Sequence, residues 1–170
     1  MYAAILAAIA GGARRFGEIS SKVGLDRANL TRYLGILGDL GLVEREVPVL
    51  ERHPDKSRKG LYRVADPFTA TWFALVHPFR NLLETGDIDL AWPDVKAALD
   101  RRLPLAAEPV VRDLFRRSCA DVIPFPVAYA GRHWGDGPEF DAVYLDAERT
   151  RAFVLEIKWT RAPVDVAVLA

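Results

Sequence analysis

The sequence predicts an α+β protein in which a helical, basic first part is followed by a part built on paired strands. Apolar residues recur at helical spacing up to residue 40 and alternate with polar residues near residue 155. Of the 170 residues, 51% are apolar, which is enough to bury one sizeable core or two small ones. Residues 1–64 carry 11 Lys and Arg against 7 Asp and Glu, whereas residues 65–170 carry 12 against 16. We therefore expect two small units.

Three helices are expected within the first 40 residues. Apolar side chains recur every three or four positions in three runs, which are Tyr2–Ile9, Phe16–Val23 and Leu30–Leu40. Glycines follow the first two runs, as at helix C-termini, and Asp26 stands where the N-cap of the third helix is expected. Two short helices, a tight glycine turn and a longer helix are the layout of a helix-turn-helix, whose last helix enters a groove of DNA.

A basic loop between two short apolar segments predicts a winged helix-turn-helix, to which we assign residues 1–66. Val43–Leu50 and Gly60–Val64 are expected to be strands, and Glu51–Lys59 has the composition of a wing. The side chains that could reach phosphates or base edges lie near the start of the third helix and in this loop: Arg27, Asn29, Thr31, Arg32, Lys56, Arg58 and Lys59. Winged helices also serve as protein-interaction modules, so DNA contact and protein contact both stay open.

Residues 67–104 are expected to form a helical linker. Aromatic side chains crowd into the segment after Asp66, and Pro78 is expected to limit or kink a helix there. A platform for stacking single-stranded nucleic acid would need basic residues between the aromatics, and only Arg80 lies near, so packing is the favoured interpretation. The segment Arg101–Pro104 is the expected hinge between the units.

Residues 105–170 are expected to form an αβ domain. A helix over residues 106–118 carries Glu108 toward its apolar face, where a carboxylate must be paired, protonated or bound to metal. An exposed glutamate favoured by the helix dipole is the equal alternative. The strands expected next are residues 122–130, Phe140–Leu145 and Ala152–Trp159, with an irregular glycine-rich loop at residues 131–138.

Three ionisable side chains are expected to converge on the last hairpin. Glu156 and Lys158 share one face of a strand because side chains alternate, and Asp141 lies opposite the interval between them. Two carboxylates beside a lysine suit a metal-dependent phosphodiesterase, in which the carboxylates hold Mg²⁺ and the lysine orients or activates water. The candidate catalytic residues are Asp141, Glu156 and Lys158, and the candidate Mg²⁺ ligands are Glu108, Asp141 and Glu156. A surface salt bridge is the competing interpretation.

Three stretches are distinctive in combination: Leu61–Phe68 with Trp72–Phe73, Gly131–Trp134 with Glu139–Asp141, and Leu155–Trp159. Together they resemble the C-terminal region of archaeal-type AAA ATPases, from about residue 15 onward. In that family a winged helix follows the ATPase module, and a domain of unknown function related to the PD-(D/E)XK nuclease fold ends the chain. The resemblance implies that Asp141, Glu156 and Lys158 match the nuclease motif and that Glu108 matches its helical glutamate. Gly131 and Trp134 match a family motif of unclear role.

Several sequence features limit the functions that the chain is expected to have. No Gly-rich Lys-Ser/Thr phosphate loop occurs, so the chain is not expected to be an ATPase by itself. Only Thr160–Ala170 follow the last strand, so we expect the nuclease-like domain to be truncated. The apolar run Met1–Ala10 is too short to cross a bilayer, so no membrane contact is expected. The single cysteine, Cys119, fits a reducing compartment, and the expected location is cytoplasmic.

Three functions are open on this reasoning. The first in rank is a noncatalytic DNA-binding accessory region of an AAA-type ATPase, which keeps the αβ part for packing. The second is a Mg²⁺-dependent DNA endonuclease that cuts with the Asp141, Glu156 and Lys158 cluster. The third is a protein-interaction module that packs against the ATPase module or a second copy of itself. The concentration of positive charge on the expected helix and wing favours DNA over the third function.

Overall fold

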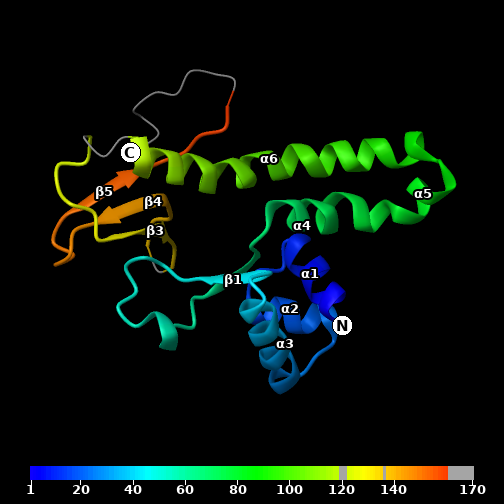
Figure 1. The fold of residues 1–170 in the computed structure, drawn as a ribbon, viewed down its shortest axis with the longest axis horizontal. Helices are drawn as coiled ribbons and strands as arrows, with labels where there is room; N and C mark the ends of the chain where they lie inside the picture. The colour runs from blue at the N-terminus through cyan, green and yellow to red at the C-terminus, as the bar shows by residue number, and fades with distance from the viewer. Residues whose placement is uncertain (119–121, 136, 161–170) are drawn as a thin grey trace. The chain divides into compact units, whose positions relative to one another are not determined.

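The computed structural model describes residues 1–118, 122–135 and 137–160. Cys119 and the residues from 161 onward, which entered the expectations about location and truncation, lie outside this description. The chain forms two units, one of Met1–Glu46 with Gly60–Arg101 and one of Val47–Lys59 with Arg102–Ala170. It therefore passes from one unit to the other three times, as the course of the coloured ribbon in Figure 1 lets the reader follow.

The first unit begins with the three expected helices, α1 (Tyr2–Ala10), α2 (Phe16–Val23) and α3 (Arg27–Asp39). Gly24 ends α2 at φ 68°, a left-handed conformation that glycine adopts without steric cost. Asp26 caps α3 by accepting a hydrogen bond of 2.9 Å from the backbone N–H of Asn29, and this bond is the main cause that lowers the pKa of Asp26. The large buried side chains of the core that these helices share with the hairpin are Ile5, Leu6, Ile9, Ile19, Leu30, Leu34, Leu37, Val43 and Val64.

A two-stranded antiparallel hairpin follows, made of β1 (Val43–Glu46) and β2 (Leu61–Val64). The expectation of a first strand that reaches Leu50 was wrong. Pro48 has no N–H to donate to a ladder, and the next residue, Val49, bonds to another part of the chain. The connection between the strands contains the short 3₁₀ helix η1 (Pro54–Lys56), and its residues Val47–Lys59 belong to the second unit.

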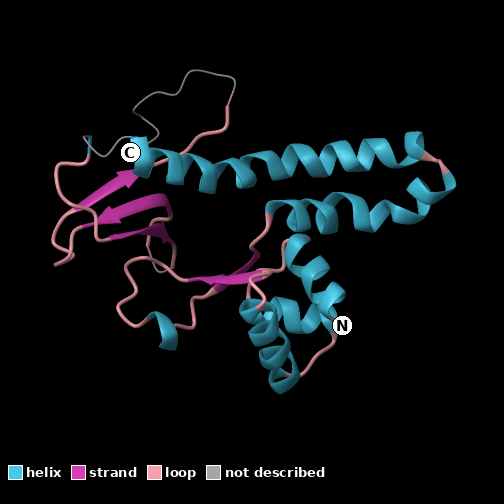
Figure 2. Ribbon diagram, viewed as in Figure 1, coloured by secondary structure: helices cyan, strands magenta, loops and turns pink. Residues whose placement is uncertain are grey.

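The expected aromatic helix is a run of four helical segments, all drawn as helix in Figure 2. They are α4 (Pro67–Thr71), the π-helical η2 (Trp72–Val76), the 3₁₀ helix η3 (His77–Phe79) and α5 (Arg80–Thr85). The hydrogen-bonding pattern changes around Pro78, which lacks an N–H, so the kink expected there takes the form of a change of helix type.

The long helix α6 (Ile88–Ser118) runs through the segment in which a hinge was expected. Pro104 does not end it, because a proline removes one backbone hydrogen bond while the neighbouring residues continue the helical pattern. The division between the units falls at Arg101 within this helix. No helix in the described part of the chain combines the length and apolar composition that crossing a bilayer requires.

The second unit contains a three-stranded antiparallel sheet in the order β3 (Tyr129–His133), β4 (Phe140–Leu145) and β5 (Ala152–Leu155). The expected hairpin is therefore present, but β3 starts later than expected and includes part of the segment taken as an irregular loop. A bulge between Gly131 and His133 lets that segment pair with β4. The sheet packs its Ala142, Tyr144, Phe153 and Leu155 with Phe115 of α6 and with Ile123 and Phe125.

Candidate nucleic-acid interface and carboxylate cluster

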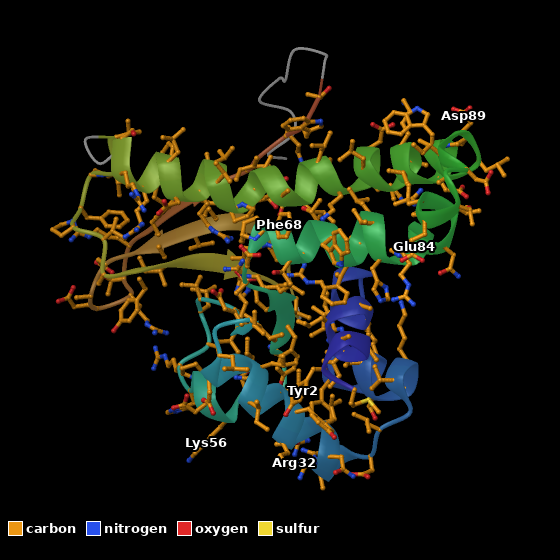
Figure 3. All side chains as sticks on the ribbon, turned by 45° about the vertical axis from the view of Figure 1, so that its right-hand side comes forward. Tyr2, Arg32, Lys56, Phe68, Glu84 and Asp89 are labelled. Carbon is orange, nitrogen blue, oxygen red and sulfur yellow. The ribbon has the colours of Figure 1, made fainter. Side chains whose placement is uncertain are left out.

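The outer face of α3 carries all four helix residues that the sequence nominated for DNA contact. Arg27, Asn29, Thr31 and Arg32 are exposed, while Leu30, Leu34 and Leu37 of the same helix are buried. The apolar stripe thus fixes the rotation of the helix, and the polar residues face solvent. Figure 3 shows the Arg32 side chain at the outer surface of the helix.

The four side chains differ in whether their polar atoms are already hydrogen-bonded within the chain. The Asn29 amide donates to the Asp26 carboxylate at 2.6 Å, and the Thr31 hydroxyl donates to the main-chain oxygen of Arg27 at 2.8 Å. The guanidinium of Arg27 lies 5.8 Å from the ring centre of Phe16, and that of Arg32 lies 5.1 Å from the ring centre of Tyr33. Aromatic contact restrains an arginine without neutralising it, so these two charges are the ones available to phosphate.

The basic loop Val47–Lys59 is attached to the sheet of the second unit. The Val49 N–H donates to the main-chain oxygen of Arg132 at 2.8 Å, and the indole N–H of Trp134 donates to that of Lys59 at 2.9 Å. Lys56 and Arg58 are exposed, whereas Lys59 is half-buried. Figure 3 shows the Lys56 side chain directed away from the ribbon. The nominated DNA contacts are therefore divided between the two units.

Asp141, Glu156 and Lys158 meet at the open end of the β4–β5 hairpin. Asp141 accepts a 2.9 Å hydrogen bond from the backbone N–H of Ile157 through its Oδ2 atom, and Lys158 is paired with the Glu156 carboxylate. The hydrogen bond with Glu156 is the main cause that raises the pKa of Lys158, and the charges of Glu156 and Asp141 raise it further. The strand expected to reach Trp159 ends at Leu155, so the expectation that Glu156 and Lys158 share one face of a strand was wrong. Both residues follow β5, and the pair formed by Ala142 and Leu155 at the end of the β4–β5 ladder brings this segment close to Asp141.

Glu108 takes part in a different cluster. It lies half-buried on α6, with its carboxylate 4.0 Å from the guanidinium of Arg132, which also lies 2.8 Å from Glu139. Among the described residues, no group of three or more His, Cys, Asp and Glu side chains is arranged to hold a metal ion. Lys158 pairs with Glu156 and the backbone N–H of Ile157 engages Asp141, so the carboxylates as placed do not fit the Mg²⁺ that the residue types led us to expect.

Asp146 was assigned only to a polar turn, yet it is a buried charged residue with 3% of its surface exposed. Its carboxylate accepts hydrogen bonds from the Thr150 N–H (2.7 Å), the Thr150 hydroxyl (2.9 Å), and the N–H (3.1 Å) and Nε (3.1 Å) of Arg151. Burial alone raises the pKa of Asp146, but the bonds from Arg151 and Thr150 outweigh it and hold the pKa well below its usual range. The residue thus closes the β4–β5 turn.

Stability that depends on Asp146 is expected to be lost in acid. A carboxyl whose pKa is lower in the folded than in the unfolded chain contributes stability above its unfolded pKa of about 3.9, and that contribution fades as the pH falls through the folded pKa. Asp146→Asn should therefore lower the free energy of unfolding at pH 7 and lower it progressively less below about pH 4. Urea denaturation across pH 3–7 measures the difference. The exposed Asp94→Asn is the control, and a difference independent of pH would contradict the expectation.

The fold defines a winged helix-turn-helix followed by an αβ unit, and the comparisons with known proteins agree with that order. The family model of the IclR helix-turn-helix domain matches residues 3–47, which contain α2, α3, β1 and all of α1 except Tyr2. The family model DUF234, described as archaea bacterial proteins of unknown function, matches residues 72–167, which are more than half of the chain. The chain belongs to this family.

A curated relative extends the comparison beyond the family models. "Uncharacterized protein MJECL04" of Methanocaldococcus jannaschii is 33% identical to this chain over 159 residues, which are 93% of the chain. The chain spans 35% of the length of that relative. No solved structure matches the chain.

Proposed function

We propose that this chain is a DNA-binding accessory region of a longer AAA-type ATPase, and that its nuclease-like αβ unit does not cut DNA. The observation that carries the DNA part is the outer face of α3, where Arg27 and Arg32 are exposed, restrained by aromatic rings and outside any ion pair with the described residues. A helix presented in this way is the element with which helix-turn-helix proteins read the major groove. The resemblance of the sequence to the C-terminal region of archaeal-type AAA ATPases supports the proposal that the chain is part of a longer ATPase.

The noncatalytic part of the proposal rests on the pairing of the candidate catalytic groups. Lys158 is held by Glu156, and Asp141 is engaged by the backbone of Ile157. A lysine paired in this way and with a raised pKa stays protonated at neutral pH, so it is a poor base for activating water. The three side chains are therefore better suited to stabilising the open end of the β4–β5 hairpin than to catalysis.

The proposal is tested by titrating labelled duplex DNA with the protein at two salt concentrations, with and without Mg²⁺, while scoring binding and cleavage together. We expect binding that weakens with salt, because cations that neutralise phosphates release counterions. Arg32→Ala should weaken binding and reduce the slope of log affinity against log salt by about one. Arg80→Ala, an exposed residue of α5 in the same unit, is the control and should leave the slope unchanged. Absence of binding even at low salt would overturn the proposal in favour of protein interaction.

The second candidate function is a Mg²⁺-dependent endonuclease, for which the proximity of Asp141, Glu156 and Lys158 is the motivating observation. It requires the pair of Lys158 with Glu156 and the bond of Asp141 to Ile157 to open so that the carboxylates can bind the ion. The same titration decides it, because cleavage that needs Mg²⁺ would appear in the samples scored for binding. If the cluster cuts, Asp141→Asn and Lys158→Ala should each abolish cleavage while leaving DNA affinity nearly unchanged. Cleavage that survives both substitutions would have to come from another site or from a contaminant.

A further inference from the structure

The loop Val47–Lys59 is held against the sheet of the second unit near both of its ends. Near its start, the Val49 N–H donates to the main-chain oxygen of Arg132 at 2.8 Å. At its end, the main-chain oxygen of Lys59 accepts the indole N–H of Trp134 at 2.9 Å. Between these points, Arg149 donates to the main-chain oxygen of Glu51 at 3.4 Å. Two of these three bonds involve the segment Gly131–Trp134, the stretch that sequence reasoning could give no role.

The residue types in this segment suit contact with the loop. Trp134 is 6% exposed, and its indole offers a hydrogen-bond donor at the edge of a large apolar ring, which suits a buried approach to a carbonyl. A Cβ on Gly131 would lie 3.2 Å from the Cβ of Val49, closer than such atoms ordinarily approach. Glycine at this position therefore lets the loop lie against β3.

The loop is also braced internally, in a way that leaves its outer cations exposed. The Ser57 hydroxyl donates to the Glu51 carboxylate at 3.3 Å and accepts the Lys59 N–H at 3.2 Å. Lys56 and Arg58 alternate with the anchoring residues and are exposed. A loop already ordered in this way loses less conformational entropy when its cations meet a ligand.

We propose that the segment Gly131–Trp134 is a clamp that positions this loop, and that Trp134 and Gly131 act through it on the contact of Lys56 and Arg58 with DNA phosphates. The DNA part rests on the proposed function, whereas the clamp itself does not. Through the clamp, the strand β3 takes part in DNA binding without touching DNA. Trp134 and Gly131 are thus positioning residues, with the loop as the element they hold.

Hydrogen exchange followed by mass spectrometry tests the clamp without DNA. Trp134→Phe keeps an aromatic ring and removes the N–H donor, so exchange in peptides covering residues 47–59 should accelerate by roughly tenfold, while peptides from α1 to α3 stay unchanged. Trp92→Phe replaces an exposed tryptophan of α6 and is the control. Unchanged exchange in the loop of Trp134→Phe would overturn the clamp.

A pair of glycine substitutions gives the same test without changing the buried Trp134. Gly131→Ala places a Cβ against Val49, whereas Gly137→Ala places one where no other atom lies within 4 Å. We expect hydrogen exchange in the loop to be faster in Gly131→Ala and unchanged in Gly137→Ala. Equal exchange in the two variants would overturn the role given to Gly131.

A double-mutant cycle on duplex DNA tests positioning. The paired substitution Lys56→Ala with Arg58→Ala should weaken binding by roughly tenfold in the otherwise unchanged protein, and by clearly less in the Trp134→Phe background, because the cations there are no longer held in place. Additive effects would overturn the positioning role. If even the unchanged protein binds no DNA, the proposed function and the DNA part of this inference fall together, while the exchange measurements still decide the clamp.

Discussion

Tyr144→Ala is expected to lower the free energy of unfolding of the second unit by about 3–5 kcal/mol. Tyr144 is fully buried in β4, and its ring centre lies 5.7 Å from that of Phe115 and 6.4 Å from that of Phe153. Its hydroxyl donates to the main-chain oxygen of Arg112 at 3.0 Å, which ties α6 to the sheet. The substitution removes the ring contacts and this bond together and leaves a cavity under the helix.

Urea denaturation with hydrogen exchange on peptides from β4 measures the loss and assigns it to the second unit. Tyr144→Phe is the matched control, since it keeps the ring and removes only the hydroxyl, and should cost about 1 kcal/mol. If the two variants were equally unstable, the hydroxyl rather than the packed ring would hold α6 to the sheet. A loss below about 1 kcal/mol for Tyr144→Ala would contradict the position of this residue at the centre of the core.

Reversing both exposed arginines of α3 is expected to weaken duplex binding on the order of a hundredfold. Each bidentate contact of an arginine with a base edge is worth about 1–3 kcal/mol, and about 1.4 kcal/mol corresponds to a tenfold change in affinity. In Arg27→Glu with Arg32→Glu, each new carboxylate also repels the phosphates. Both side chains lie on the solvent face of the helix, so the fold should be retained.

The control for this double reversal is Arg80→Glu with Arg101→Glu. These residues are exposed, belong to the same unit and give the same change in net charge, but they lie outside the helix-turn-helix. Fluorescence anisotropy with labelled duplex should show a small loss for the control and a large loss for the α3 variant. Equal losses in the two variants would mean that general electrostatic attraction, rather than the α3 face, accounts for binding.

The elements that could be predicted from the sequence are those fixed by neighbours along the chain. The spacing of Leu30, Leu34 and Leu37, with the cap at Asp26, determines both the start of α3 and the face it exposes. The short polar turn was likewise enough to predict that β4 pairs with β5, whereas the strand alternation expected at Glu156 and Lys158 does not occur because β5 ends at Leu155. Periodicity and turn chemistry act over a few residues, so one chain contains the information needed.

What could not be predicted depends on partners that are distant in the sequence. The loop Val47–Lys59 has the composition of a solvated wing, and nothing near it shows that Trp134 will bond to Lys59. For Glu108 the sequence left three alternatives, which were metal binding, ion pairing and exposure. Its neighbour Arg132 lies on β3, a strand that starts later than the sequence predicted. Asp146 was assigned to a turn because polar composition does not show that a carboxylate will be buried.

The three passages of the chain between its units limit how the protein can be divided. A fragment ending at residue 66 would keep the loop but lose the β3 strand on which it lies, and a fragment starting at residue 72, where the match to DUF234 begins, would keep the strand but lack the loop. No single cut of the gene leaves both units whole. The helix-turn-helix and the αβ unit are therefore expected to be inherited as one piece, although the two family models divide them.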